Sequence, residues 1–138
     1  MEQRQLDVRI PSDVRYIESI VEQVVLRCAA HRYPRRHLAL NVPVALTEAL
    51  SNAILRGNRD DSSRSVHVRA EVTASRLVLE VRDEGTGFDL DACTEDPTTP
   101  ENLLREDGRG LFLMRRLMDQ VERFSDGGNV VRLTLNRA

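Results

Sequence analysis

The sequence contains no lysine and no tryptophan, and its aromatic share is only 4%. All 20 basic residues are therefore arginine. The absence of lysine excludes the phosphate-binding P-loop, the strand lysine of protein kinases and any Schiff-base lysine, because each needs a primary amine. A chain of this composition that handles phosphates must use backbone amides, arginines or a metal ion. The scarcity of aromatic rings also argues against base-stacking platforms for single-stranded nucleic acid.

Other deficits narrow the class of protein further. The two cysteines, Cys28 and Cys93, form no closely spaced pair, so neither a disulfide framework nor a zinc site is predicted. The net charge of −2 does not indicate direct binding of nucleic acid, because phosphate neutralisation needs a basic surplus. No apolar run reaches the roughly 18–20 residues of a membrane helix, and residues 1–10 lack the apolar segment of a secretory signal. We therefore expect a cytoplasmic protein with no membrane partner.

The composition, 41% apolar and 30% charged, predicts a single globular domain over residues 1–138. Strands are predicted from alternation at 6–10, 66–72, 77–81 and 131–135, and helices from apolar spacing at 12–33, from the late thirties or Pro43 to 57, and at 110–121. Ser12 is the expected N-cap of the first helix. The predicted order, β-α-α-β-β-lid-α-β-β, lacks strict βαβ alternation and favours an α+β two-layer sandwich.

Three groups of residues could carry chemistry, and the first is on the second predicted helix. Glu48, Asn52 and Arg56 follow one another at intervals of four residues. Each interval turns the helix by only about 40°, so the three side chains form one stripe beside the apolar face. They offer a carboxylate, an amide and a guanidinium to a groove along the helix. Spacing alone also fits a solvated helix edge with a mild Glu–Arg attraction.

The second group is the segment DEGTGF, residues 83–88, which follows a predicted strand. Asp83 shares the strand face of the core residues, so its carboxylate points inward, where it needs a hydrogen-bond donor. Gly85 and Gly87 allow a tight turn and a close approach of the backbone to a ligand. The alternative is a glycine-rich loop with Asp83 at its solvated end.

The third group is Gly108-Arg109-Gly110 at the expected start of the third helix, after a long segment without periodicity. A helix N-terminus with adjacent glycines presents free N–H groups to an anion. The dinucleotide fingerprint is excluded because its third glycine is absent. Alternatively, the glycines are hinges that close a lid, which we place at approximately 84–109.

Together, the segments EALSNAILRGN, VRDEGTGFD and GRGLFLMRRLMDQV resemble the anti-sigma factor serine kinases, which are small, stand-alone members of the Bergerat-fold (GHKL) ATPase superfamily. The resemblance runs from about Leu6 to the final strand. It implies a mixed, mostly antiparallel sheet covered on one face by three helices, with an ATP lid. It leaves no room for the phosphoacceptor helices of a histidine kinase.

The resemblance also implies roles for single residues. Asn52 would hold the Mg²⁺ that bridges the phosphates of ATP or ADP, and Glu48 would be the general base for an attacking serine hydroxyl. The Asp83 carboxylate would accept a hydrogen bond from the exocyclic amine of adenine. The further nucleotide-binding positions that it implies are Arg56, Gly85, Gly87, Arg105, Gly108, Arg109 and Gly110.

The sequence departs from the family pattern in places. The last strand begins Gly-Asn-Val at 128–130 where many relatives have Gly-Thr-Thr. Val130 cannot supply the water-mediated threonine contact with adenine, which predicts a reorganised pocket or a weaker affinity. Arg56 stands where the family often has histidine. The lid arginine that touches the terminal phosphate in some relatives has no direct match, and Arg105 and Arg109 are the neighbours that could substitute.

The function implied by the resemblance is a switch. The protein would sequester an RNA polymerase sigma factor, act as a homodimer, and use ATP to phosphorylate a serine on a STAS-type anti-anti-sigma protein. Two alternatives stay open: a nucleotide-binding regulatory module without kinase activity, and a split histidine-kinase catalytic domain that acts on a separate phosphoacceptor.

Overall fold

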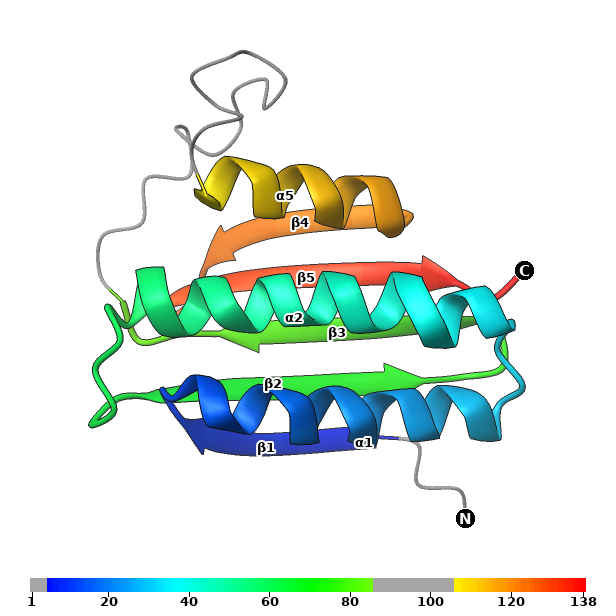
Figure 1. Cartoon of the computed structure of the whole chain (residues 1–138), viewed down its shortest axis with the longest axis horizontal. Coiled ribbons are helices and arrows are strands. Elements are labelled where there is room, and N and C mark those ends of the chain that lie inside the picture. The colour runs from blue at the N-terminus through cyan, green and yellow to red at the C-terminus, as the bar shows by residue number, and fades with distance from the viewer. Residues whose placement is uncertain (1–4, 86–105) are drawn as a thin grey trace.

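The computed structural model describes residues 5–85 and 106–138, with residues 106–109 described by their backbone alone (Figure 1). Gly87, Arg105 and most of the predicted lid lie outside the described residues. Residues 106–109, at the end of the predicted lid, belong to a helix, and the lid itself stays a prediction.

Five strands of the described chain form one sheet in the order β1-β2-β3-β5-β4, and each neighbouring pair is antiparallel. These strands are β1 (Gln5–Pro11), β2 (Ser65–Val72), β3 (Arg76–Arg82), β4 (Gln120–Ser125) and β5 (Asn129–Asn136). The turn between β2 and β3 closes at Thr73, whose backbone N–H and hydroxyl both bond to the backbone of Arg76. This turn confirms the hairpin predicted from the alternation.

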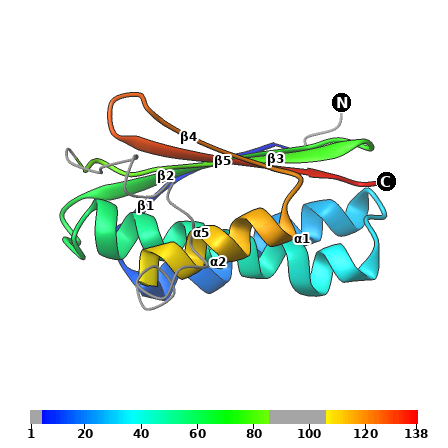
Figure 2. The same cartoon turned by 90° about the horizontal axis from the view of Figure 1, so that it is seen from above.

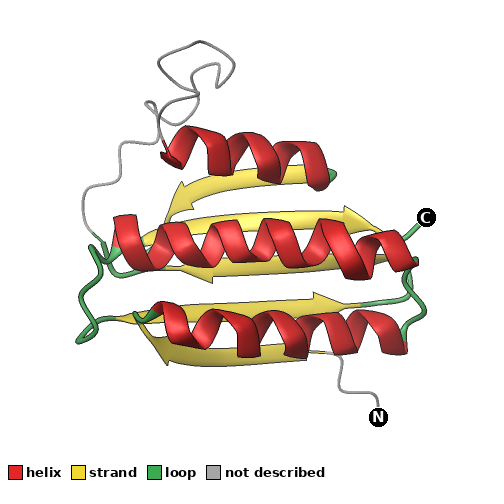
Figure 3. Ribbon diagram, in the orientation of Figure 1, coloured by secondary structure: helices red, strands yellow, loops and turns green. Residues whose placement is uncertain are grey.

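The helices of the described chain lie on one face of the sheet (Figure 2). They are η1 (Val14–Tyr16), α1 (Ile17–Ala30), η2 (His37–Asn41), α2 (Val42–Asn52), η3 (Ala53–Gly57) and α5 (Glu106–Leu117). The π-helical turns η2 and η3 extend α2 at its two ends. Seen from the helical side, α1 runs over β1 and β2, α2 over β3 and β5, and α5 beside β4 (Figure 3). The predicted two-layer α+β sandwich is confirmed.

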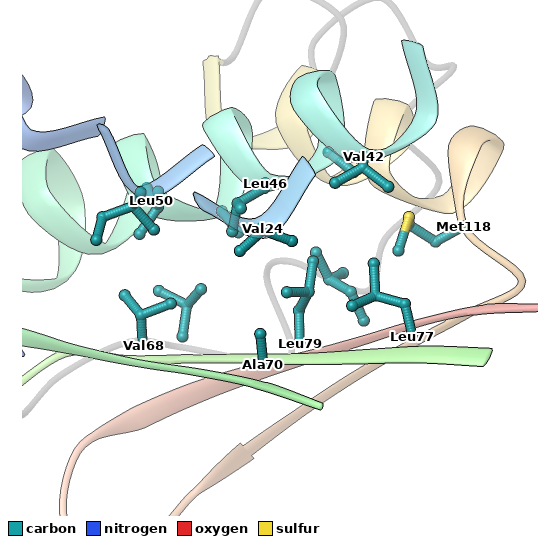
Figure 4. Close-up of a cluster of buried hydrophobic side chains, with 14 of the residues drawn as sticks. Val24, Val42, Leu46, Leu50, Val68, Ala70, Leu77, Leu79 and Met118 are labelled. Atoms are coloured by element: carbon teal, nitrogen blue, oxygen red, sulfur yellow. The ribbon is translucent and has the colours of Figure 1, made fainter. Parts of the chain in front are cut away.

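The hydrophobic core fills the space between the two layers (Figure 4). Val24 of α1 and Leu46 of α2 are completely buried on the helical side, and Leu77 and Leu79 are completely buried on the sheet. Full burial of one such side chain stabilises the fold by about 1.5–3 kcal/mol. The alternation of β3 therefore fixes which of its residues face the helices, and Asp83 continues the same alternation.

The run His37–Gly57 is the central helix of the helical layer. It has 21 residues and a mean hydropathy of 1.4 in its most apolar window, so by length and composition alone it could cross a membrane. In the fold, 44% of that window is buried. Its fully buried residues include Leu46, Leu50 and Ile54, so packing against the sheet accounts for its apolar character.

The start of the first helix differs from the prediction. Asp13, not Ser12, is the capping residue, and it caps the short helix η1 that precedes α1: the Asp13 carboxylate accepts the N–H of Arg15 at 2.9 Å. Ser12 is buried, and its hydroxyl donates to the carbonyl of Ile54 at 3.4 Å. The serine therefore ties β1 to the end of α2 rather than capping α1.

The third predicted helix is displaced along the chain. It begins at Glu106 rather than at Gly110, and it ends at Leu117, so that Val121 belongs to β4. An acidic residue in the first turn of a helix is stabilised by the helix dipole, which favours the earlier start. Gly110 therefore lies inside α5 and does not present a free N-terminal amide.

Candidate functional site

One pocket of the described chain lies between α2, α5 and strands β3, β4 and β5. The residues on its wall that matter below are Asn52, Ala53, Asp83, Met114, Arg123 and Asn129. Apolar side chains with a few convergent polar groups are typical of a small-molecule site.

Asp83 lies at the end of β3 and is only 4% exposed. Its Oδ1 accepts hydrogen bonds from the Gly85 N–H at 2.7 Å and, on β5, from the Asn129 N–H at 3.3 Å and the Asn129 side-chain amide at 3.2 Å. Burial raises the pKa of Asp83 above its ordinary value, and these hydrogen bonds partly offset the shift. The predicted inward-pointing carboxylate is confirmed.

Glycines surround Asp83 because no side chain fits there. A Cβ atom at Gly57 would overlap the Asp83 carboxylate, and one at Gly85 would overlap the carbonyl oxygen of Gly57. Gly128 has a φ of +144°, and a Cβ atom there would overlap the Asp83 carbonyl oxygen. Gly85 thus lies close to the backbone of Gly57, while its predicted close approach to a ligand stays a prediction. The tight fit of Gly57 and Gly128 depends on contacts between distant segments.

The helix stripe and the third glycine motif meet across α2 and α5. A Cβ atom at Gly110 would lie 2.8 Å from Glu48 Oε1 and 3.1 Å from Asn52 Nδ2. Asn52 lines the pocket together with Asp83, and the half-buried Glu48 lies one turn away on the same helix. Gly110 therefore matters as the residue that lets α5 approach these two side chains.

The other predicted site residues that the structure describes are not among those on the pocket wall. Arg56 is exposed on η3 and is not part of the pocket wall. Gly108 and Arg109 belong to the first turns of α5 by their backbone. Within residues 5–85 and 110–138, no group of three or more His, Cys, Asp or Glu side chains could hold a metal ion alone.

Two pocket residues carry signals that the sequence prediction did not use. Arg123 pairs with Val131 on β5 and lines the pocket. The alternation of Val121 and Arg123 indicates a strand, but the prediction extends the third helix to Val121 and so does not include Arg123 in the site. Asn129, rather than Val130, bonds to Asp83, so the start of β5 still supplies a polar contact. The reorganised pocket or weaker affinity expected from Val130 stays a prediction.

Comparison with known proteins agrees with this geometry. The family model described as histidine kinase-like ATPase domain matches residues 10–135. The serine-protein kinase RsbW of Bacillus velezensis is 32% identical over 135 residues, which cover 94% of this chain and 83% of the relative. The anti-sigma F factor of Bacillus thuringiensis is 28% identical over 120 residues, which cover 85% of this chain and 82% of the relative.

A solved structure shares the architecture. The nucleotide-free catalytic domain of histidine kinase ThkA superposes with a TM-score of 0.57 and covers 96% of this chain and 97% of that domain. The two sequences are only 12% identical, so this likeness concerns the fold alone.

Proposed function

This chain belongs to the family of histidine kinase-like ATPase domains, and we propose that it is an ATP-dependent serine-protein kinase that also acts as an anti-sigma factor. The names of its relatives, serine-protein kinase and anti-sigma F factor, support the two roles. The observation that carries the proposal is that Asp83 and Asn52 lie on the wall of one pocket, with Glu48 one helical turn from Asn52.

Asp83 is the residue proposed to recognise the adenine base. Three donors bond to its Oδ1, and its Oδ2 lies against Gly57, where a Cβ atom would overlap it. A buried carboxylate favours a ligand that donates a hydrogen bond, as the exocyclic amine of adenine does. Apolar wall residues such as Ala53 and Met114 suit the faces of a flat base. Gly85 and Gly87 are proposed to let the backbone pass close to it.

Asn52 fits a magnesium ion bound together with phosphates. Mg²⁺ takes amide and carboxylate oxygens, usually only one or two from the protein, and substrate phosphates complete its shell. The Asn52 side chain lies against Gly110 and offers an amide oxygen. Mg²⁺ held there, with Asn52 as its proposed ligand, would neutralise phosphate charge in a chain that has no lysine.

Glu48 is the proposed general base. Its carboxylate takes the proton from the attacking serine hydroxyl as the serine oxygen forms a bond to the γ-phosphorus of ATP. The bond between that phosphorus and the bridging oxygen of ADP breaks, and ADP leaves with the electron pair. The products are a phosphoserine and ADP.

The remaining nucleotide contacts are proposed for the residues around the pocket mouth. Residues 1–138 would act as one nucleotide-binding domain, with a lid that begins near residue 84 and ends before α5. Arg105 and Arg109 would approach the terminal phosphate, and Arg56 would add positive charge at the end of the helix stripe. Gly108 and Gly110 would let α5 pass close to the phosphates.

The proposed protein substrate is a STAS-type anti-anti-sigma protein, and the proposed sequestered partner is an RNA polymerase sigma factor. We place this exchange in the cytoplasm, with the kinase acting as a homodimer. What supports the pair of partners is that one relative is named a serine-protein kinase and another an anti-sigma factor.

Transfer of labelled phosphate from γ-labelled ATP to a STAS-domain protein of the same organism tests the function directly. We expect Mg²⁺-dependent label that survives acid, as phosphoserine does. Acid-labile label would indicate phosphohistidine and a split histidine kinase instead. Nucleotide binding without any transfer would indicate a regulatory module. A chain that binds no adenine nucleotide would contradict the whole proposal.

A further inference from the structure

The side chain of Asn58 joins the end of α2 to the loop that carries Asp83. Asn58 is fully buried directly after η3. Its amide nitrogen donates to the Ser65 carbonyl at 2.9 Å, and its amide oxygen accepts the Glu84 N–H at 2.7 Å. Both ends of the carboxamide are therefore occupied by backbone groups, one from β2 and one from the loop after β3.

The backbone amides of that loop are each bonded to a different partner. The Asp83 N–H donates to the Asn129 carbonyl on β5, and the Gly85 N–H turns back to the Asp83 carboxylate. The Glu84 N–H, between them, donates to Asn58. The bond to Asn58 is thus the one of these three that ties the loop to the end of α2.

This tie matters because the two halves of the proposed nucleotide site lie on different elements. Asn52, proposed for the metal and phosphates, is on α2, and Asp83, proposed for the base, follows β3. One nucleotide can reach both only if their spacing is held, and a misplacement of about 1 Å can slow a reaction at such a site by about two orders of magnitude. Asn58 bonds to the residue next to Asp83 and so lies where it can hold this spacing.

We propose that Asn58 is a positioning residue for nucleotide binding, which fixes Asp83 relative to α2 without touching the ligand. This inference rests on the proposed function, because it requires a nucleotide that bridges Asn52 and Asp83. Removal of the carboxamide leaves the Glu84 N–H and the Ser65 carbonyl without their partners. Buried groups of this kind recover partners by moving toward water or other groups, and the loop moves with them.

Ser12 offers a matched control. It is as buried as Asn58, with 1% of its surface exposed, and its hydroxyl bonds to Ile54 at the same end of α2. Its backbone N–H bonds to Arg64, and no hydrogen bond joins it to residues 83–85 among those found in the described chain. Ser12→Ala therefore loosens the same helix end without releasing the Asp83 loop.

The test compares Asn58→Ala with Ser12→Ala in the full chain, with Mg²⁺-ADP binding measured by calorimetry and thermal unfolding measured in parallel. We expect Asn58→Ala to raise the Kd for ADP about tenfold or more, and Ser12→Ala to change it less than about twofold. Both variants should lower Tm. The KM for ATP should follow the Kd, while kcat at saturating ATP stays near wild type, because Glu48 and Asn52 remain on α2.

A second variant covers the case in which Asn58→Ala does not fold. Asn58→Asp keeps an oxygen that accepts the Glu84 N–H and gives up the amide donor to Ser65. Asn58→Asp should lower Tm and still bind ADP with an affinity close to that of the wild type. The Glu84 amide should stay protected from hydrogen exchange.

Three results would overturn the role of Asn58. They are an unchanged Kd in Asn58→Ala, equal losses of affinity in Asn58→Ala and Ser12→Ala, and a loss of affinity in Asn58→Asp that only follows its stability. Each of these leaves nucleotide binding by the wild type intact. A wild type that binds no nucleotide overturns the proposed function itself, so the two failures are distinguishable.

Discussion

Gly110 of α5 lies so close to Glu48 of α2 that a Cβ atom at residue 110 would be 2.8 Å from the Glu48 Oε1. Real Cβ atoms essentially never approach another atom this closely, so a side chain at residue 110 must displace the glutamate. The displaced group is the end of a flexible side chain, and its movement is therefore inexpensive for the fold. The proposed general base depends in this way on the absence of a side chain on the neighbouring helix.

Gly110→Ala should separate stability from catalysis. In the interior of a helix, alanine is more favourable than glycine by up to about 1 kcal/mol, which offsets the cost of moving Glu48. We expect Tm to change by only a few degrees while serine phosphorylation falls about tenfold or more, because the proton acceptor is displaced. Circular dichroism and phosphotransfer measure the two effects. Full activity in this variant would contradict the assignment of Glu48.

Gly57→Ala should damage both the fold and the nucleotide site. A methyl group at residue 57 would overlap the Asp83 carboxylate, which is buried and held by three hydrogen bonds. Overpacking of this kind costs about 1–3 kcal/mol. We expect a lower Tm and loss of measurable ADP binding in calorimetry.

Gly127→Ala is the control for that loss. Gly127 has a φ of +68°, and a Cβ atom there meets nothing within 4 Å. The variant bears only the backbone strain of about 1–2 kcal/mol. It should lower Tm and leave the Kd for ADP unchanged, and an equal loss of binding in the two variants would assign the effect to stability alone.

Asp83→Asn should weaken nucleotide binding while keeping the shape of the side chain. An asparagine can place its nitrogen donor where the ligand amine also presents a donor. We expect Mg²⁺-ADP affinity to fall by about 1–3 kcal/mol, the usual cost of leaving a buried polar group unsatisfied. Calorimetric titration measures the change, and binding equal to wild type would remove Asp83 from the site.

Much of this site could be predicted from the sequence because its residues sit in regular elements. The alternation of β3 continues to Asp83, so its inward direction follows from the pleat of the strand. The spacing of Glu48 and Asn52 follows from the helical repeat. Local periodicity is sufficient for both.

The remaining features depend on packing between segments that are distant in sequence. Nothing local indicates that Gly57 must lie against Asp83, or that Asn58 must bond to Glu84. The start of α5 was mispredicted because glycines usually weaken a helix interior, whereas Gly110 is required there by the approach of α2. Arg123 was missed because the helical pattern extended into β4, where strand alternation governs instead.

The stability difference between Asp83→Asn and wild type should depend on pH. Burial raises the pKa of Asp83 above its ordinary value of 3.8, so the native state binds this proton more tightly than the unfolded state. The stability that the protonated carboxyl contributes is fully present below the unfolded pKa and is lost as pH rises through the raised native pKa. The asparagine variant is neutral throughout. Urea unfolding should therefore show the variant gaining on wild type as the pH rises above the unfolded pKa, and a difference that stays constant with pH would contradict the raised pKa.

Glu48→Gln separates a kinase from a passive nucleotide clamp. The substitution keeps the shape and a hydrogen-bonding group beside Asn52, but it removes the proposed proton acceptor. We expect the Kd for Mg²⁺-ADP to change little, while serine phosphorylation of the antagonist falls by roughly 10²–10⁴-fold. Glu22→Gln, on the exposed face of α1, is the control for the loss of one carboxylate and should leave both quantities unchanged. Sigma-factor binding, measured by co-purification, should survive in both variants. If Glu48→Gln transfers phosphate at the wild-type rate, the proton leaves by another route and the base assignment is wrong.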